Sequence, residues 1–217
     1  MSNSKALNSG FLLYLIILLV AVYIAIIYII MDPTSLPYME AKINMDGLIF
    51  DIWKYFFYAH ITFGLVSLAL GPFLLINRNE KTEKLHRNFG IFYAATIFIN
   101  TLIVPYLAIF ATGGLPTGIA FLTLAVAWFA TTWVGVWRMI QKEYQLHQEW
   151  MLRSYVLTMV FVTFRILVTI ISMSFQVSND VAFPVSISLA IVVNLVIVEI
   201  LIRKSRRKLN NVKNVIS

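Results

Sequence analysis

Three histidines and one arginine are the residues of this chain best suited to do chemistry. His60 lies in an apolar, aromatic run, whereas His86 and His147 each follow a leucine in a polar segment between two apolar runs. Imidazole titrates near neutral pH and is the commonest metal ligand in proteins. The structural alternative is a neutral imidazole hydrogen-bonded to a neighbouring helix for His60, and solvated interfacial side chains for the other two.

His86 and His147 together suggest a cofactor. Arg87 follows the first histidine directly, and Arg153 lies a short distance after the second. Two imidazoles from different helices can hold a haem iron while guanidinium groups meet the propionates, so b-type haem is one expectation, with His60 as a further ligand. The other expectation is a divalent transition metal bound by His86 and His147, with a carboxylate completing the shell. The carboxylates available for that shell are Glu83, Glu143 and Glu149.

Arg165 lies near the middle of a long apolar run. An unpaired arginine at the centre of a bilayer costs at least about 2.5–3.5 kcal/mol, so its side chain should face the interior of a helix bundle. The polar residues expected at similar depth are Asn100 and Asn194, and neither can cancel a charge. These three residues predict either a site for an anionic or strongly dipolar ligand, or an arginine satisfied by carbonyls, neutral side chains and water.

The elements that position these residues are predicted to be transmembrane helices. Of the 217 residues, 60% are apolar and 12% are charged, whereas a soluble domain has roughly 45–50% and about 25%. Six apolar runs are long enough to cross the roughly 30 Å of hydrocarbon. They are Phe11–Met31, Phe56–Ile76, Phe89–Ala111, Ile119–Trp137, Tyr155–Phe175 and Val181–Ile202. The sequence therefore predicts an all-α integral membrane protein, with six helices bundled in one domain. The absence of cysteine excludes thiolate metal sites and disulfides.

The basic residues predict the orientation of this bundle. If the N-terminus is cytoplasmic, the 17 Lys and Arg residues fall on the cytoplasmic side except for Lys42 and Lys54 outside and Arg165 within a span. Because Lys and Arg accumulate in cytoplasmic loops, both termini are expected in the cytoplasm. The basic tail, residues 203–217, is expected to attract anionic lipid headgroups rather than nucleic acid.

The two expected cytoplasmic loops resemble each other. Each runs from an arginine through a polar turn to Leu-His and a new helix, with His86 in one loop and His147 in the other. If the second and third spans and the fourth and fifth spans are copies of one hairpin, a pseudo-twofold axis along the membrane normal relates them. The alternative is a chance similarity, because the resemblance rests on few residues.

Two of the histidines occur in motifs. Leu85–Gly90 reads Leu-His-Arg-x-x-Gly, and His147–Ser154 reads His-x-x-Trp-Met-x-Arg-Ser. With these motifs, the segment Phe56–Phe175 resembles a family of small bacterial multi-pass membrane proteins of unknown function. In that family the second histidine is usually followed directly by arginine, where this chain has Gln148. The resemblance implies a bacterial plasma-membrane protein without implying an activity. More distantly, the layout is similar to the four-helix haem cores of membrane cytochromes b.

Three functions remain open from the sequence. The first is a ligand-binding or redox protein that holds b-type haem or a transition metal through its histidines. The second is a small transporter in which Arg165 neutralises an anionic substrate, and the third is a noncatalytic membrane assembly subunit. No nucleophile elbow, phosphate-binding loop or zinc-protease motif assigns a reaction, and the sequence leaves the oligomeric state open.

Overall fold

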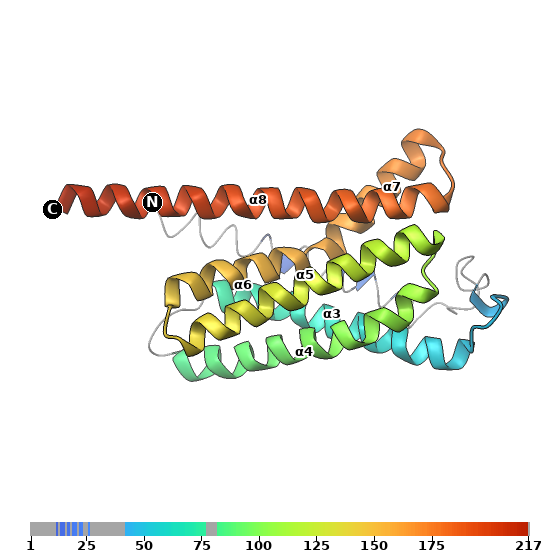
Figure 1. The fold of residues 1–217 in the computed structure, drawn as a ribbon, viewed down its shortest axis with the longest axis horizontal. Coiled ribbons are helices and arrows are strands. Elements are labelled where there is room, and N and C mark those ends of the chain that lie inside the picture. The colour runs from blue at the N-terminus through green and yellow to red at the C-terminus, as the bar shows by residue number, and fades with distance from the viewer. Residues whose placement is uncertain are drawn as a thin grey trace. The chain divides into compact units, whose positions relative to one another are not determined.

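The computed structural model describes residues 42–76 and 82–216, together with scattered positions between residues 12 and 26. Every regular element in these parts of the chain is a helix, as expected for an all-α protein (Figure 1). The first expected span, Phe11–Met31, lies largely outside the described residues. The main helices are α3 (Phe50–Ile76), α4 (Glu83–Ile109), α5 (Gly114–Ile140), α6 (Tyr144–Thr158), α7 (Val160–Phe175) and α8 (Asn179–Ile216).

In the described part of the chain, 5 helices are long and apolar enough to cross a membrane, with α6 and α7 taken as one. They correspond to the second to sixth expected spans, but their ends differ. α3 begins at Phe50 rather than Phe56, and α4 begins at Glu83 rather than Phe89. A helix propagates one hydrogen bond per residue, so its ladder continues into polar residues that water or headgroups can solvate.

The chain divides into two compact units, residues 1–122 and 123–217. In the first unit, α3 and α4 pack along each other as an antiparallel pair. Phe56 contacts Tyr106 at one end of this pair, with ring centroids 4.9 Å apart, and Phe73 contacts Phe89 at the other end at 5.0 Å. The first unit therefore has a hairpin whose inner seam carries the residues described below.

The connection between α4 and α5 is shorter than predicted. The expected loop, residues 112–118, shrinks to residues 110–113 because α5 begins at Gly114. Gly113 and Gly114 have φ angles of 86° and 69°, a left-handed conformation that glycine adopts without a steric penalty. Pro116 fits in the first turn of α5, where its missing N–H has no partner to lose.

In the second unit, the expected span Tyr155–Phe175 is broken. α6 ends at Thr158 and α7 begins at Val160, and Figure 1 shows the change of direction between them. Neither proline nor glycine lies at the break, so the usual sequence signal of a kink is missing. The Val156 carbonyl beside the break accepts a hydrogen bond from Asn194 Nδ2 of α8 at 3.1 Å.

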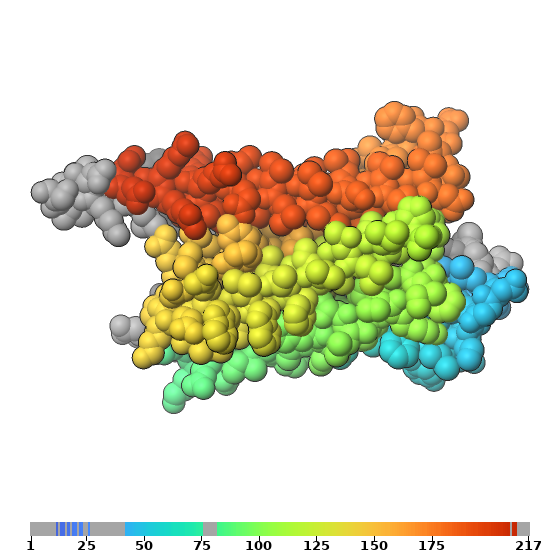
Figure 2. Space-filling model, viewed as in Figure 1, coloured from blue at the N-terminus to red at the C-terminus, as the bar shows by residue number. Residues whose placement is uncertain are grey.

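α8 is the longest helix of the described chain, with 38 residues. It continues well past Ile202, where the expected span ends, and Figure 2 shows its described residues as a long band that passes from orange to red. α8 packs against α7 and α6. Its fully buried residues include Ala182, Ile187, Ala190 and Val198, and the two alanines allow the close helix approach that membrane bundles favour.

Candidate functional site

His60 of α3 lies against Asn100 of α4 in the first unit. The His60 Nδ1 and Asn100 Oδ1 atoms are 2.6 Å apart, and Asn100 Nδ2 donates to the His60 backbone carbonyl at 3.3 Å. Because the amide nitrogen is used on this carbonyl, the amide oxygen faces the ring and accepts from Nδ1–H. The basic lone pair of the neutral His60 imidazole is therefore on Nε2. Asn100 itself is fully buried.

A hydroxyl pair joins the same two helices further along the hairpin. The Ser67 Oγ and Thr96 Oγ1 atoms are 2.8 Å apart, and both residues are buried. Each hydroxyl has one proton, so one of the two donates to the other, and the second donates within its own helix, Ser67 to the Phe63 carbonyl or Thr96 to the Tyr93 carbonyl. Such pairs hold membrane helices together by hydrogen bonds where the hydrophobic effect does not distinguish helix from lipid.

His147 of α6 is held in the second unit by a similar bond. Its Nδ1 atom lies 2.7 Å from the backbone oxygen of Gly135 in α5. A carbonyl oxygen only accepts, so Nδ1 donates and Nε2 carries the lone pair of the neutral ring. An Nδ1–H bond to a carbonyl or carboxylate is the arrangement that orients histidine ligands in many metal proteins.

The other residues of the His147–Ser154 motif hold α6 in place. The Arg153 guanidinium lies over the Trp150 ring, 4.7 Å from its centroid. Ser154 Oγ is 2.7 Å from Thr132 Oγ1 of α5, and both residues are fully buried. The spacing of the motif therefore reflects packing within the second unit as well as any chemistry of the histidine.

Two bidentate ion pairs, here called the α6–α8 clasp, join α6 to α8. Arg153 donates from Nε and Nη2 to Glu199 at 2.6 and 3.2 Å. Arg206 donates from Nε to Glu149 at 2.7 Å, and its Nη2 binds the second carboxylate oxygen. Arg153, expected to meet a haem propionate, and Glu149, expected in a metal shell, are thus bound to α8 instead. The sequence signal for these ion pairs is the spacing of Glu199 and Arg206, which puts both on one face of α8.

The described residues contain no group of three or more His, Cys, Asp or Glu side chains that could hold a metal ion. Two of the expected carboxylate donors are instead paired with arginines. Glu143 binds Arg138 at 2.5 Å, and Glu149 binds Arg206. A protein-only metal shell around His86 or His147 is therefore not formed in this part of the chain.

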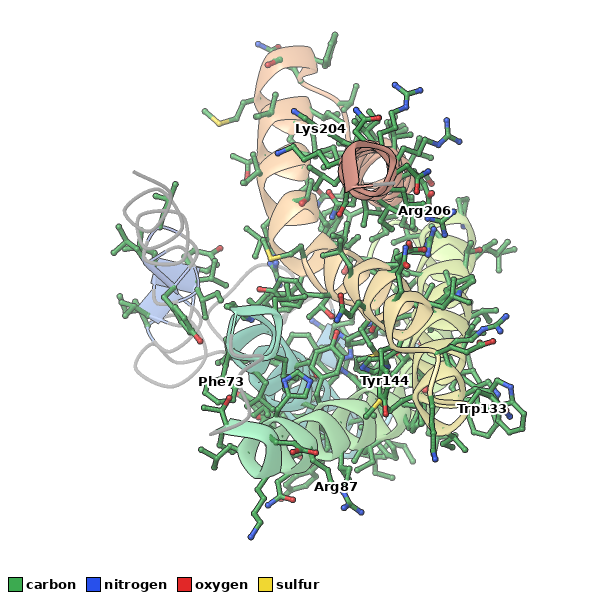
Figure 3. All side chains as sticks on the ribbon, turned by 90° about the vertical axis from the view of Figure 1, so that its left-hand side faces the viewer. Phe73, Arg87, Trp133, Tyr144, Lys204 and Arg206 are labelled. Carbon is green, nitrogen blue, oxygen red and sulfur yellow. The ribbon has the colours of Figure 1, made fainter. Side chains whose placement is uncertain are left out.

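His86 lies in the second turn of α4, half-buried, in the first unit. The adjacent Arg87 is exposed, and Figure 3 shows its side chain pointing away from the helix ribbons. His86 therefore belongs to the hairpin of His60, whereas His147 belongs to the second unit.

Arg165 is half-buried in α7, next to Phe164, whose ring packs edge-on against Phe183 of α8. Among the described residues, no carboxylate pairs with Arg165. Asn194 uses its amide elsewhere, since its oxygen accepts from Thr163 Oγ1 at 3.2 Å and its nitrogen supports the helix break. The polar residues expected near Arg165 thus have other partners.

Lys42, which the charge pattern places on the outer side of the membrane without any further role, is a buried cation. Its ammonium donates to the backbone oxygen of Phe110, the C-cap residue directly after α4, and 5% of the lysine is exposed. Burial lowers the pKa of Lys42 because desolvation disfavours the charged form. Carbonyls at a helix C-terminus lack intrahelical donors and carry partial negative charge, so Lys42 caps α4.

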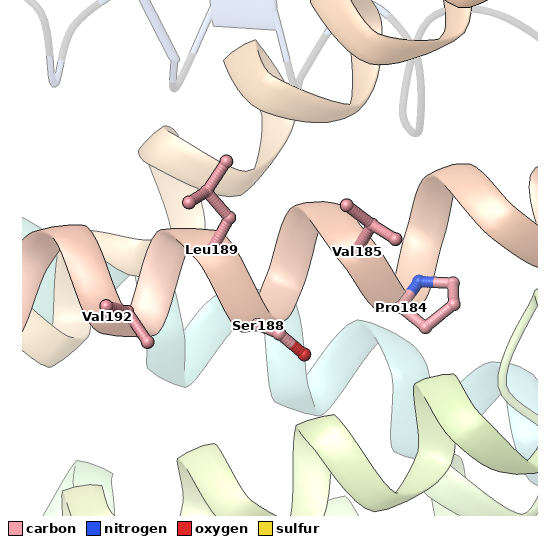
Figure 4. A pocket seen from close by; sticks show the side chains of 5 residues that line it. All are labelled: Pro184, Val185, Ser188, Leu189 and Val192. Carbon is pink, nitrogen blue, oxygen red and sulfur yellow. The ribbon is translucent and has the colours of Figure 1, made fainter.

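A surface depression on α8 is apolar except for one hydroxyl (Figure 4). Its lining consists of Pro184, Val185, Ser188, Leu189 and Val192. These residues include no titratable group, so the depression offers no chemistry, and its surface suits the acyl chain of a lipid.

Comparison with known proteins identifies a family of membrane proteins. Residues 57–202 match the family described as "Predicted membrane protein (DUF2306)". No curated protein and no solved structure matches the chain. The matched segment ends at Ile202, so it contains the three histidines, Arg165 and every clasp residue except Arg206.

Proposed function

This chain belongs to the DUF2306 family of predicted membrane proteins, and from its histidine geometry we propose that it binds b-type haem in the membrane. The observation that carries the proposal is a hydrogen bond of the same kind at each of two histidines. The Nδ1–H group of His60 and that of His147 each face a carbonyl oxygen of a neighbouring helix. This bond fixes the tautomer in which Nε2 can bind iron and raises the basicity of that nitrogen.

Haem suits these residues better than a bare metal ion. A porphyrin supplies four nitrogen ligands itself, so the protein needs to add one or two imidazoles and no carboxylate shell. The described carboxylates near His147 form ion pairs with arginines, so imidazole is the side chain that remains to bind iron. Bound haem would supply one-electron chemistry, and the protein residues would position it and exclude water.

The proposal includes an orientation, with both termini in the cytoplasm of a bacterial cell. It rests on the bias of Lys and Arg toward one side of the predicted spans. In the second unit, the Arg138–Glu143 pair and the clasp lie with the basic end of α8 at the proposed cytoplasmic end. His147 is then near the cytoplasmic surface and His60 near the outer end of α3.

The test is an absorption spectrum of the full chain, produced with a haem precursor and purified in detergent. We expect a Soret band that shifts on reduction with dithionite, and that is lost in His60→Ala, in His147→Ala or in both. His86→Ala is the matched control, and it should keep its haem. The proposal fails if the wild-type protein has no such band even after titration with haemin, or if both histidine variants retain it.

A second candidate function is favoured by Arg165. A half-buried arginine in an apolar helix, without a carboxylate partner among the described residues, can attract an anionic substrate. Proteoliposomes should then take up a labelled anion such as phosphate, sulfate or acetate. Arg165→Gln should abolish uptake, while Arg165→Lys keeps part of it. Absence of uptake by the wild-type protein rejects this function, and co-purified membrane proteins with neither activity indicate an assembly subunit.

A further inference from the structure

α8 carries a run of positive charge directly after the long apolar stretch of the helix, which ends at Ile202. Arg203, Lys204, Arg206, Arg207 and Lys208 follow Ile202, and the helix continues through them without a break. At about 1.5 Å per residue, the run extends about 9 Å along the helix axis. This distance is close to the Debye length of about 8 Å at physiological ionic strength, so all five cations lie within reach of charged headgroups.

The α6–α8 clasp fixes which of these cations face outward. Glu199 and Arg206 both point to α6, where they bind Arg153 and Glu149. Successive residues are rotated by roughly 100° about the helix axis, so Glu199 and Arg206 point in nearly the same direction, toward α6. Measured from this direction, the other four cations lie at angles between about 50° and 190° around α8. Figure 3, which views α8 end-on, shows Lys204 and Arg206 on different sides of this helix.

These four cations form what we call the basic face of α8: Arg203, Lys204, Arg207 and Lys208. All four are exposed, and no carboxylate of the described residues pairs with them. Arg206 differs because its charge is balanced by Glu149. The basic face therefore keeps a full positive charge that the described residues leave uncompensated.

We propose that the basic face of α8 binds the phosphate groups of anionic phospholipids in the bilayer that holds the protein. A membrane-spanning helix that runs straight into the face holds it at the depth of the headgroups. The guanidinium group of Arg can form two parallel hydrogen bonds to phosphate oxygens, and the long Lys side chain can reach along the membrane–water interface. Both residue types therefore suit a phosphate ligand. Juxtamembrane Lys and Arg clusters attract anionic lipid in the same way. Arg206 then orients the face instead of binding lipid.

The test is native mass spectrometry of the full chain in detergent with equal amounts of phosphatidylglycerol and phosphatidylcholine. The wild-type protein should retain phosphatidylglycerol in severalfold excess, and added salt should reduce the excess. The variant Arg203→Gln, Lys204→Gln, Arg207→Gln, Lys208→Gln should bring the ratio close to one. The matched control neutralises exposed cations elsewhere, Lys84→Gln, Arg87→Gln and Lys142→Gln, and should keep the excess.

Two outcomes overturn the proposal. One is a quadruple variant that retains the wild-type excess of phosphatidylglycerol while eluting as a folded monodisperse protein. The other is a wild-type protein without any lipid preference that binds a soluble polyanion such as heparin through the same four residues, which would assign the face to a soluble acidic partner. Replacement of Arg203 and Arg207 by lysine keeps the charge and should keep the lipid excess, which separates loss of charge from loss of folding.

Discussion

At the scale of single residues, hydrogen bonds decide which nitrogen of each imidazole is basic. Asn100 spans both the ring and the backbone of His60, so its amide cannot flip without losing a bond. The Gly135 carbonyl oxygen can only accept a hydrogen bond, so His147 must donate to it from Nδ1. Two histidines in separate units thus present the same nitrogen, Nε2, as their base.

The His60–Asn100 pair should show a measurable coupling. Buried side-chain pairs lose about 1–3 kcal/mol when one partner is left unsatisfied, so Asn100→Leu and His60→Ala should each lower the free energy of unfolding. Because the two residues bind each other, we expect the double variant to cost less than the sum of the singles by about 0.5–2 kcal/mol. SDS titration measures the free energy of unfolding of the wild-type protein, the two single variants and the double variant. Strictly additive losses would contradict an interaction between His60 and Asn100.

Lys42 predicts a pH dependence of stability. Its pKa is lowered by burial in the folded protein, so between that value and the ordinary lysine value of about 10.4 the unfolded state binds more protons. Stability therefore rises with pH through this alkaline window. Lys42→Met should remove this part of the rise when melting temperatures are compared from neutral to alkaline pH. A variant whose pH profile parallels that of the wild-type protein would show that Lys42 is not buried.

The residue scale is also where the sequence predicts least. His60, His147 and Arg165 stand out by type and surroundings, but their partners do not. Glu199 is bound to Arg153, and this contact depends on the rotation of α8, which the sequence does not give. Asn194 looks like a ligand for a charge, yet it supports a helix break that has no sequence signal.

At the scale of helices, close approach depends on particular glycines. An added Cβ at Gly118 in α5 would lie 2.5 Å from the backbone oxygen of Ala108 in α4, whereas a Cβ at Gly90 would meet nothing within 4 Å. Backbone atoms cannot move aside as a flexible side chain can, so a larger residue at Gly118 would clash with α4. The tight turn between α4 and α5 and this contact therefore depend on each other.

The two glycines make a matched pair of substitutions. Gly118→Ala should destabilise the protein by about 1–3 kcal/mol because the helices must separate. Gly90→Ala should be neutral or stabilising by about 0.5–1 kcal/mol, since alanine restricts the unfolded chain and favours the helix. Thermal melting in one detergent compares them directly. Equal effects of the two substitutions would mean that α4 and α5 do not approach at Gly118.

Helices were the most predictable feature, and their limits follow from physical causes. Long apolar runs located the second to sixth spans because a bilayer demands about 20 apolar residues from each. The same rule underestimates α3, α4 and α8 at their polar ends, where backbone hydrogen bonds continue beyond the apolar core. It also misses the break at Met159, because supporting side chains on α8 are distant in the sequence.

At the scale of the whole molecule, the charge distribution predicts a topology that can be measured. The chain has no cysteine, so single cysteines report position without background. Asp46→Cys, on the proposed outer side, should react with a membrane-impermeant maleimide in intact cells. Lys84→Cys and Gln141→Cys, both at exposed positions, should react only after the membrane is permeabilised. The reverse pattern would invert the proposed orientation.

The α6–α8 clasp also imposes an order on the making of the protein. Its partners are separated by 46 and 57 residues of chain, so a ribosome adding about 5–20 residues per second makes the clasp residues of α6 roughly 2–11 s before their partners on α8. Until then Glu149 and Arg153 lack Arg206 and Glu199, and these two opposite charges, four residues apart on α6, can interact with each other. Closure of the clasp is thus a late event in biogenesis, and a nascent chain halted before α8 lacks both interhelical ion pairs of the finished protein.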